Sequence, residues 1–165
     1  MKRASLINRC RAELERGASR HVGLQLVCTL LHTDVSHYDW VGFYIAVPDE
    51  KLLVLGPYEG APTDHVRIPY GRGICGQAAE RLETFVVADV GAQDNYLACS
   101  IHVKSEIVVP VFRHGAFVAE IDIDSHTVDA FTPEDRVFLT ELAEMCAPWI
   151  PEIPAENEGH STAEE

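Results

Sequence analysis

Two runs of β-forming residues stand next to each other in the sequence with only a short turn between them. The first, SEIVVPVF, covers residues 105–112, and the second, AFVAEIDIDS, covers residues 116–125. The residues between them include His114 and Gly115, which are typical of a tight turn. The pair predicts an antiparallel hairpin, so we expect the fold to be built around an antiparallel sheet.

The other predicted elements flank this hairpin in the sequence. Short β-branched or aromatic runs predict further strands, namely WVGFYIAV (40–47), KLLVL (51–55), HVRIP (65–69) and FVVADV (85–90). Helical spacing of apolar residues, glycine-rich openings and caps predict helices at 2–16, 20–36, within GRGICGQAAERL (71–82), and from Thr132 and Pro133 to about Trp149. Strands in the middle with helices at both ends predict an α+β domain.

Length and charge restrict the class of protein further. A chain of 165 residues suits one domain, which we expect over residues 1–150 with the helices of residues 2–36 included. Residues 151–165 hold two prolines and five glutamates and are expected to form a disordered acidic tail. The net charge of −13 argues against nucleic acid as a partner. No apolar run approaches the roughly 18 to 20 residues of a membrane span, and we expect a cytoplasmic protein.

The strand segment AEIDIDS alternates strictly between acidic and apolar residues. Its isoleucines therefore point to one face of the sheet, and its acids, Glu120, Asp122 and Asp124, point to the other. A solvated sheet face is one interpretation. A pocket is the other, because neighbouring carboxylates repel each other and aspartate is uncommon in strands. If the hairpin pairs, Glu106 joins the aspartates, and the group could hold an ammonium ion or keep one carboxyl protonated as a general acid.

Five cysteines, an odd number, stand at positions 10, 28, 75, 99 and 146 without a CxxC pair. Their spacing predicts neither a disulfide framework nor a zinc site, and the scattered histidines give no reason to assign a metal. Cys75 follows Gly71 and Gly73 at a predicted helix N-terminus, where the helix dipole favours a thiolate. Local reasoning therefore makes Cys75 the candidate reactive thiol, with packing of the first helical turn as the alternative. The role of Cys99, in a predicted loop, stays open on local grounds.

Trp40 and Tyr44 form a pair of aromatic residues on one predicted strand. They are four residues apart, so their side chains point to the same face of the sheet. They fit either a hydrophobic core or the wall of a pocket.

Five segments taken together resemble one known family. They are WVGFY (40–44), VRIPYGRGICG (66–76), YLACS (96–100), SEIVVP (105–110) and IDIDS (121–125). Their order and spacing are similar to those of the free methionine-(R)-sulfoxide reductases, enzymes built on a single GAF domain, over roughly residues 20–150. The resemblance implies a GAF-like fold, with the N- and C-terminal helices on one side of the sheet and a ligand pocket on the other.

The resemblance also implies a reaction. The family reduces the R epimer of free methionine sulfoxide to methionine without a bound cofactor, and thioredoxin serves as the reductant. The residue that matches the family's nucleophile is Cys99, which would become a sulfenic acid, and this overrules the local preference for Cys75. The carboxylic acid that protonates the leaving oxygen would be Glu106 or Asp124.

Substrate-binding residues are implied in the same way. The substrate's methyl group would contact the aromatic wall of Trp40 and Tyr44, and its ammonium group would contact the acids, including Asp122. Its carboxylate would bind loop amides around Tyr96 and Ala98. The family is often dimeric, so we expect a homodimer.

One position departs from the family pattern. The family commonly carries a resolving cysteine ten positions before the cysteine of the GRGxCG motif, and here that position is His65. Cys75 is the candidate replacement, which would form a disulfide with Cys99 for thioredoxin to reduce. The alternatives are direct reduction of the sulfenic acid by an external thiol, or poor turnover.

Two other functions remain open from the sequence. A GAF domain can bind a small ligand without converting it, and the missing resolving cysteine keeps this interpretation available. A redox-sensing protein is the second alternative, and it would need a reactive Cys99 without substrate selectivity.

Overall fold

The computed structural model describes residues 2–97 and 101–155. Within these ranges six strands form one antiparallel sheet in the order β3-β2-β1-β6-β5-β4. The strands are β1 (Trp40–Val47), β2 (Leu52–Glu59), β3 (Arg67–Pro69), β4 (Phe85–Val87), β5 (Ser105–Arg113) and β6 (Ala116–Ser125). The predicted hairpin is the β5–β6 pair at the centre of the sheet, which confirms the antiparallel architecture.

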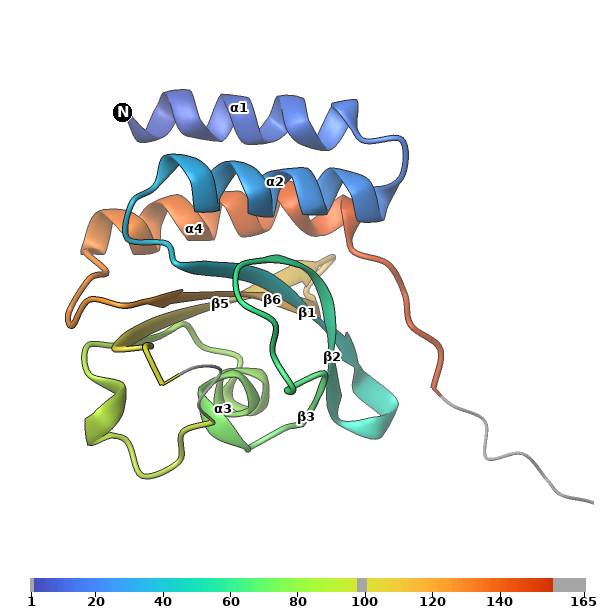
Figure 1. The fold of residues 1–165 in the computed structure, drawn as a ribbon. Coiled ribbons are helices and arrows are strands. Elements are labelled where there is room, and N and C mark those ends of the chain that lie inside the picture. The colour runs from blue at the N-terminus through green and yellow to red at the C-terminus, as the bar shows by residue number, and fades with distance from the viewer. Residues whose placement is uncertain (1, 98–100, 156–165) are drawn as a thin grey trace, which may run out of the picture.

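Helices cover both faces of the sheet, with three of the described helices on one side and one on the other (Figure 1). The helices of the described residues are α1 (Arg3–Arg16), α2 (Arg20–Asp34), α3 (Gly73–Arg81) and α4 (Pro133–Cys146), with short 3-10 turns at Pro48–Glu50, Val90–Ala92 and Ala147–Trp149. In Figure 1, α2 and α4 lie against one face with α1 outside them, and α3 lies on the opposite face. This confirms the predicted placement of the terminal helices on one side. None of the described helices is both long and apolar enough to cross a membrane.

The two faces of the sheet carry two separate apolar clusters. The larger cluster fills the space between the sheet and α1, α2 and α4, and it includes Phe43, Ile121 and Ile123. The smaller cluster lies on the α3 face and includes Trp40 and Tyr44. Because side chains alternate along a strand, the isoleucines of β6 enter the larger core and the acids of β6 must point toward α3.

Three strand boundaries differ from the predicted ones. β2 runs on to Glu59 instead of ending at residue 55, and the pairing of β1 with β2 shifts register between Gly42 and Tyr44. Pro57, which has no N–H to donate, is accommodated by this irregularity. β3 is confined to Arg67–Pro69, and β4 ends at Val87 because a 3-10 turn follows.

The first and last helices are tied together at Asp135. Thr132 caps α4 as predicted, through a capping box in which Thr132 and Asp135 exchange side-chain to backbone hydrogen bonds. Asp135 also pairs with Arg3 and accepts a 2.7 Å hydrogen bond from the Tyr38 hydroxyl. Burial raises the pKa of Asp135, but these hydrogen bonds and the charge of Arg3 outweigh burial and hold the pKa below its usual value.

The start of the predicted acidic tail contacts the domain. Residues 151–155 contain no helix or strand, yet Ile153 packs against the larger core and Glu152 lies 3.7 Å from Arg113. Residues 156–165 of the predicted tail lie outside the described residues.

Candidate active site

A row of acids crosses the α3 face of the sheet. Glu106 on β5 is paired in register with Asp124 on β6, and Asp124 is paired on its other side with Trp40 on β1. Asp122 and Glu120 follow on the same face of β6. All four acids are at most 4% exposed. A solvated sheet face, the first interpretation of the AEIDIDS pattern, is therefore wrong, because the acids are buried on the α3 face, where Glu106, Asp122 and Asp124 line cavities.

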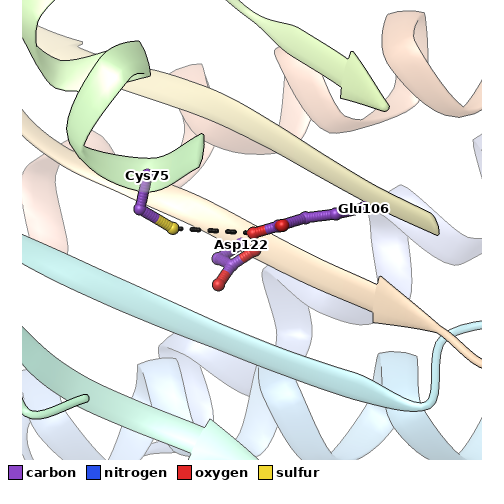
Figure 2. Close-up of side chains that lie close together, drawn as sticks. All are labelled: Cys75, Glu106 and Asp122. Carbon is purple, nitrogen blue, oxygen red and sulfur yellow. Dashed lines mark hydrogen bonds between the residues drawn. The ribbon is translucent and has the colours of Figure 1, made fainter. Parts of the chain in front are cut away.

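Helix α3 places Cys75 above this row. Cys75 lies in the first turn of the helix, and its sulfur donates a weak hydrogen bond to Glu106, with 3.7 Å between Sγ and Oε1. Figure 2 shows Cys75, Glu106 and Asp122 pointing toward one another from α3, β5 and β6. The site is thus assembled from three elements that are distant in sequence.

Three of these acids, Glu106, Glu120 and Asp122, are buried, and the pKa of each is raised. Among the residues that the structure describes, no Lys or Arg forms an ion pair with Glu106, Glu120 or Asp122. Burial raises the pKa of Glu106 well above its usual range, and the charges of Asp122 and Asp124 raise it further. Burial also raises the pKa of Glu120 and of Asp122. The pocket therefore retains protons at pH values where exposed carboxyl groups have lost them.

The pKa of Cys75 is shifted in the opposite direction to the one predicted from its position at a helix N-terminus. Burial raises the pKa of the Cys75 thiol well above its ordinary value, and Asp122, Glu120 and Glu106 raise it further. Desolvation and several carboxyl groups outweigh the dipole of a nine-residue helix. The structure therefore contradicts the local prediction of a stabilised Cys75 thiolate, because its surroundings favour the neutral thiol.

Aromatic rings form the wall of the pocket beside Asp124. The rings of Trp40 and Tyr44 stack with 6.3 Å between centroids, and Tyr58 stacks on the other side of Trp40 at 5.3 Å. The Trp40 indole N–H donates to the carbonyl of Ala61 over 3.1 Å. A side chain at Gly42 would meet this indole, because a Cβ there would lie 2.4 Å from Cη2 of Trp40. The predicted shared face of Trp40 and Tyr44 is confirmed.

Two cavities lie along this acidic row. The smaller one has a volume of about 10 Å³ and is lined by Tyr44, His65, Cys75, Glu106 and Asp122, among others. The larger one, of about 350 Å³, is more open and is lined by Trp40 and Asp124 together with residues such as Asp39, Glu59 and His126. The predicted site residues are therefore divided between two cavities, with Asp122 in one and Asp124 in the other.

The loop that precedes Cys99 is fastened to the start of α3. The side chain of Asn95 accepts a hydrogen bond from the Gly73 N–H and donates one to the Gly71 carbonyl, each over 2.9 Å. Leu97 packs against Gly73, where a Cβ would lie 2.9 Å from Cγ of Leu97, and it lines the smaller cavity. Tyr96 is partly buried against the smaller apolar cluster. The predicted site residues Ala98 and Cys99 lie outside the described residues.

Comparisons with known proteins agree with this arrangement. The sequence matches the GAF domain family over residues 19–148. A free methionine-R-sulfoxide reductase of Escherichia coli is 39% identical over 113 residues, which are 68% of this chain and 67% of that protein. The chain belongs to the free methionine-R-sulfoxide reductase family. Its assignment to this family, to the GAF fold and to the oxidoreductases is therefore confirmed.

Another relative and a solved structure are also similar to this chain. Protein YtsP of Bacillus subtilis is 40% identical over 115 residues, which are 70% of each chain. The X-ray structure of the free methionine-R-sulfoxide reductase from Neisseria meningitidis in complex with its substrate has a TM-score of 0.83. It is 32% identical, and the match covers 90% of this chain and 87% of that one.

The structure adds three residues to the site that were not predicted as site residues from the sequence: Glu120, Gly42 and Tyr58. Glu120 continues the acidic row, and the strand alternation already placed it on that face, although it was not among the predicted site residues. Gly42 and Tyr58 hold the Trp40 ring, and neither carried a signal in the sequence, because their contacts depend on the pairing of β1 with β2.

Proposed function

We propose that this chain reduces free methionine-(R)-sulfoxide to methionine. The proposal rests on one observation above all, the buried group of Cys75, Glu106 and Asp122 beside an aromatic wall, in a chain similar to a reductase that was solved with its substrate. Such a pocket offers proton donors and a water-poor space for a small zwitterion. A peptide-bound methionine sulfoxide would lack the free ammonium group that the acids favour.

Substrate recognition follows from the chemistry of the walls. The substrate's ammonium group would bind at the acids. Two of them, Asp122 and Asp124, lie two residues apart on the face of β6 that points toward α3. Its methyl group would contact the stacked rings of Trp40 and Tyr44. Its carboxylate would bind amides of the loop around Tyr96 and Ala98, and the clamp of Asn95 to the start of α3 would hold that loop in place.

The chemical step needs a thiolate and an acid. The sulfur of Cys99 attacks the sulfoxide sulfur, while a protonated carboxyl group delivers a proton to the sulfoxide oxygen. The attack forms a bond between the two sulfurs. This bond then breaks as the oxygen transfers from the substrate sulfur to the Cys99 sulfur, so that methionine leaves and Cys99 becomes a sulfenic acid. Glu106 and Asp124 are the candidate acids. The raised pKa of Glu106 supports it in this role at neutral pH.

Recycling of the enzyme completes the reaction. The thiol of Cys75 attacks the Cys99 sulfenic acid, a disulfide forms and water leaves, and thioredoxin then reduces the disulfide by thiol exchange. Because the pKa of Cys75 is raised, its thiolate is scarce at neutral pH, and this step is expected to be slower than attack by an ordinary cysteine. We also propose a cytoplasmic homodimer as the working form.

One assay tests the proposal. NADPH consumption coupled through thioredoxin reductase and thioredoxin should rise with the R epimer of free methionine sulfoxide and stay near background with the S epimer or a peptide-bound substrate. A parallel measurement with dithiothreitol removes the dependence on thioredoxin. Equal rates with both epimers, or no methionine formed with dithiothreitol, would contradict the proposal. Binding of the sulfoxide without turnover would instead support a ligand-binding GAF domain.

A further inference from the structure

The buried group of Cys75, Glu106 and Asp122 has the composition of a metal site. Its three ligating atoms, one sulfur and two carboxylate oxygens, lie within 4.8 Å of one another. Helix α3 contributes Cys75, and the neighbouring strands β5 and β6 contribute Glu106 and Asp122, so the group is held between the helix and one face of the sheet (Figure 2).

The spacing of these atoms fits a small tetrahedral ion. Zinc binds thiolate sulfur at about 2.3 Å and carboxylate oxygen at about 2.0–2.2 Å, and tetrahedral angles then separate the sulfur and the oxygen by about 3.6 Å. The observed distance from Cys75 Sγ to Glu106 Oε1 is 3.7 Å. The other separations, which are at most 4.8 Å, would have to shorten toward about 3.4–3.6 Å on coordination.

Asp122 provides an independent indication of a ligand. Its side chain is completely buried, and among the described residues its carboxylate oxygens find no hydrogen-bonding group outside the cluster itself. Its polar neighbours are the Glu106 carboxyl and the Cys75 thiol. Buried carboxylates are normally paired with hydrogen-bond donors or with cations, so this arrangement leaves a place for one or the other.

We propose that Cys75, Glu106 and Asp122 bind a divalent cation of zinc-like chemistry, with one thiolate ligand, two carboxylate ligands and a water in the fourth position. The cavity of about 10 Å³ that these residues line is about the size needed for one water. Binding transfers the proton of the Cys75 thiol, and the protons held by the two carboxyl groups, to solvent. A sulfur ligand and only three protein ligands disfavour Mg²⁺ and Ca²⁺, which prefer six or more oxygens.

This inference stands apart from the proposed reductase activity, although it has a consequence for it. An ion on Cys75 and Glu106 would occupy the thiol that recycles the enzyme and one of its candidate acids. Zinc would therefore inhibit turnover, whereas the binding itself would not depend on any substrate.

Cobalt titration tests the site without an activity assay. Co²⁺ is added to the full chain carrying Cys99→Ser, and the near-ultraviolet band of thiolate-to-cobalt charge transfer is recorded along with the protons released into weak buffer. One equivalent of Co²⁺ should produce the band, Zn²⁺ should remove it by competition, and Mg²⁺ should not. The further change Cys75→Ser should abolish the band, and Asp122→Asn should weaken binding at least about tenfold.

A second cysteine provides the matched control. Cys28 is equally buried, but its thiol lies against the Pro57 carbonyl on the other face of the sheet, so Cys28→Ala should leave the band unchanged. Asp122→Asn keeps the shape of the side chain and serves as the deciding variant if Cys75→Ser does not fold. No band with stoichiometric Co²⁺, a band that survives Cys75→Ser, or unchanged affinity in Asp122→Asn would overturn the proposal.

Discussion

The Tyr44 hydroxyl donates a 2.8 Å hydrogen bond to the main-chain carbonyl of His65. This bond ties the aromatic wall of the pocket to the backbone of His65, the position at which the family resemblance implies a resolving cysteine. His65 also lines the same small cavity as Cys75 and Glu106. The chain therefore keeps the place of a second thiol next to its acids, while the thiol itself is absent.

Restoring that thiol should speed the recycling step. The change His65→Cys provides a cysteine beside the cavity, and each unit by which its pKa is lower than that of Cys75 should accelerate attack on the sulfenic acid by roughly threefold. We expect faster thioredoxin-coupled turnover and, after one turnover without reductant, a disulfide from position 65 to Cys99 by mass spectrometry. His65→Ser is the control of similar size. Turnover no faster than that of His65→Ser would show that recycling does not limit the reaction.

The raised pKa of Glu106 gives a defined pH dependence. A carboxyl group that must be protonated to act loses activity as pH rises through its folded-state pKa, so kcat/KM should decline on the alkaline side. Glu106→Gln should lower kcat by about 10²–10⁴-fold and remove this decline. The same change at Glu152, which is exposed and pairs with Arg113, serves as the control. An unchanged alkaline limb in Glu106→Gln would assign the acid to another residue, with Asp124 the next to test.

Gly42 is expected to be essential for the aromatic wall. A methyl group at this position would clash with the Trp40 indole, so Gly42→Ala should displace the ring, raise KM for the sulfoxide, and reduce the free energy of unfolding by about 1–3 kcal/mol. Gly91→Ala is the matched control, because a Cβ there meets only a side-chain oxygen of Asp89 at 3.2 Å. Thermal unfolding and substrate kinetics measure the two effects. Wild-type KM in Gly42→Ala would mean that the ring does not contact the substrate.

Glu120 should make the protein less stable at alkaline pH. Its folded-state pKa is raised above the unfolded value, so the favourable contribution is fully present below the unfolded pKa and is lost as pH rises through the folded pKa. Glu120→Gln should therefore raise the free energy of unfolding by roughly 1–2 kcal/mol at pH 8 and change it little at pH 4. Urea unfolding at the two pH values measures this. A loss of stability at pH 8 would show that Glu120 has a stabilising partner.

The sequence predicted the elements of this fold well, because the signals are local. The long hairpin of β5 and β6, the Thr132 cap and the face shared by Trp40 and Tyr44 all follow from residue spacing within one element. The limits of β2 did not follow, because Pro57 is tolerated in that strand only through an irregular pairing with β1.

The character of the site was harder to predict, because it depends on what covers the strands. Alternation put Asp122 on a face, but only the packing of α3 against that face made it buried. The same packing reversed the expectation that Cys75 forms a thiolate. The N-terminus of α3 favours a thiolate, but α3 also places Cys75 among buried acids that raise its pKa. The hairpin joined Glu106 to the aspartates, but no spacing rule joined Cys75 to them, because Cys75 lies on a separate helix.

Within residues 2–97 and 101–155, no Lys or Arg forms an ion pair with Glu106, Glu120 or Asp122, and this affects what stability alone would favour at these positions. Each of these residues has a neutral replacement of almost the same shape that would relieve the burden of a buried charge. Stability alone would therefore favour the amide at each of these positions. The three acids are expected to serve the chemistry of the pocket and not the stability of the fold.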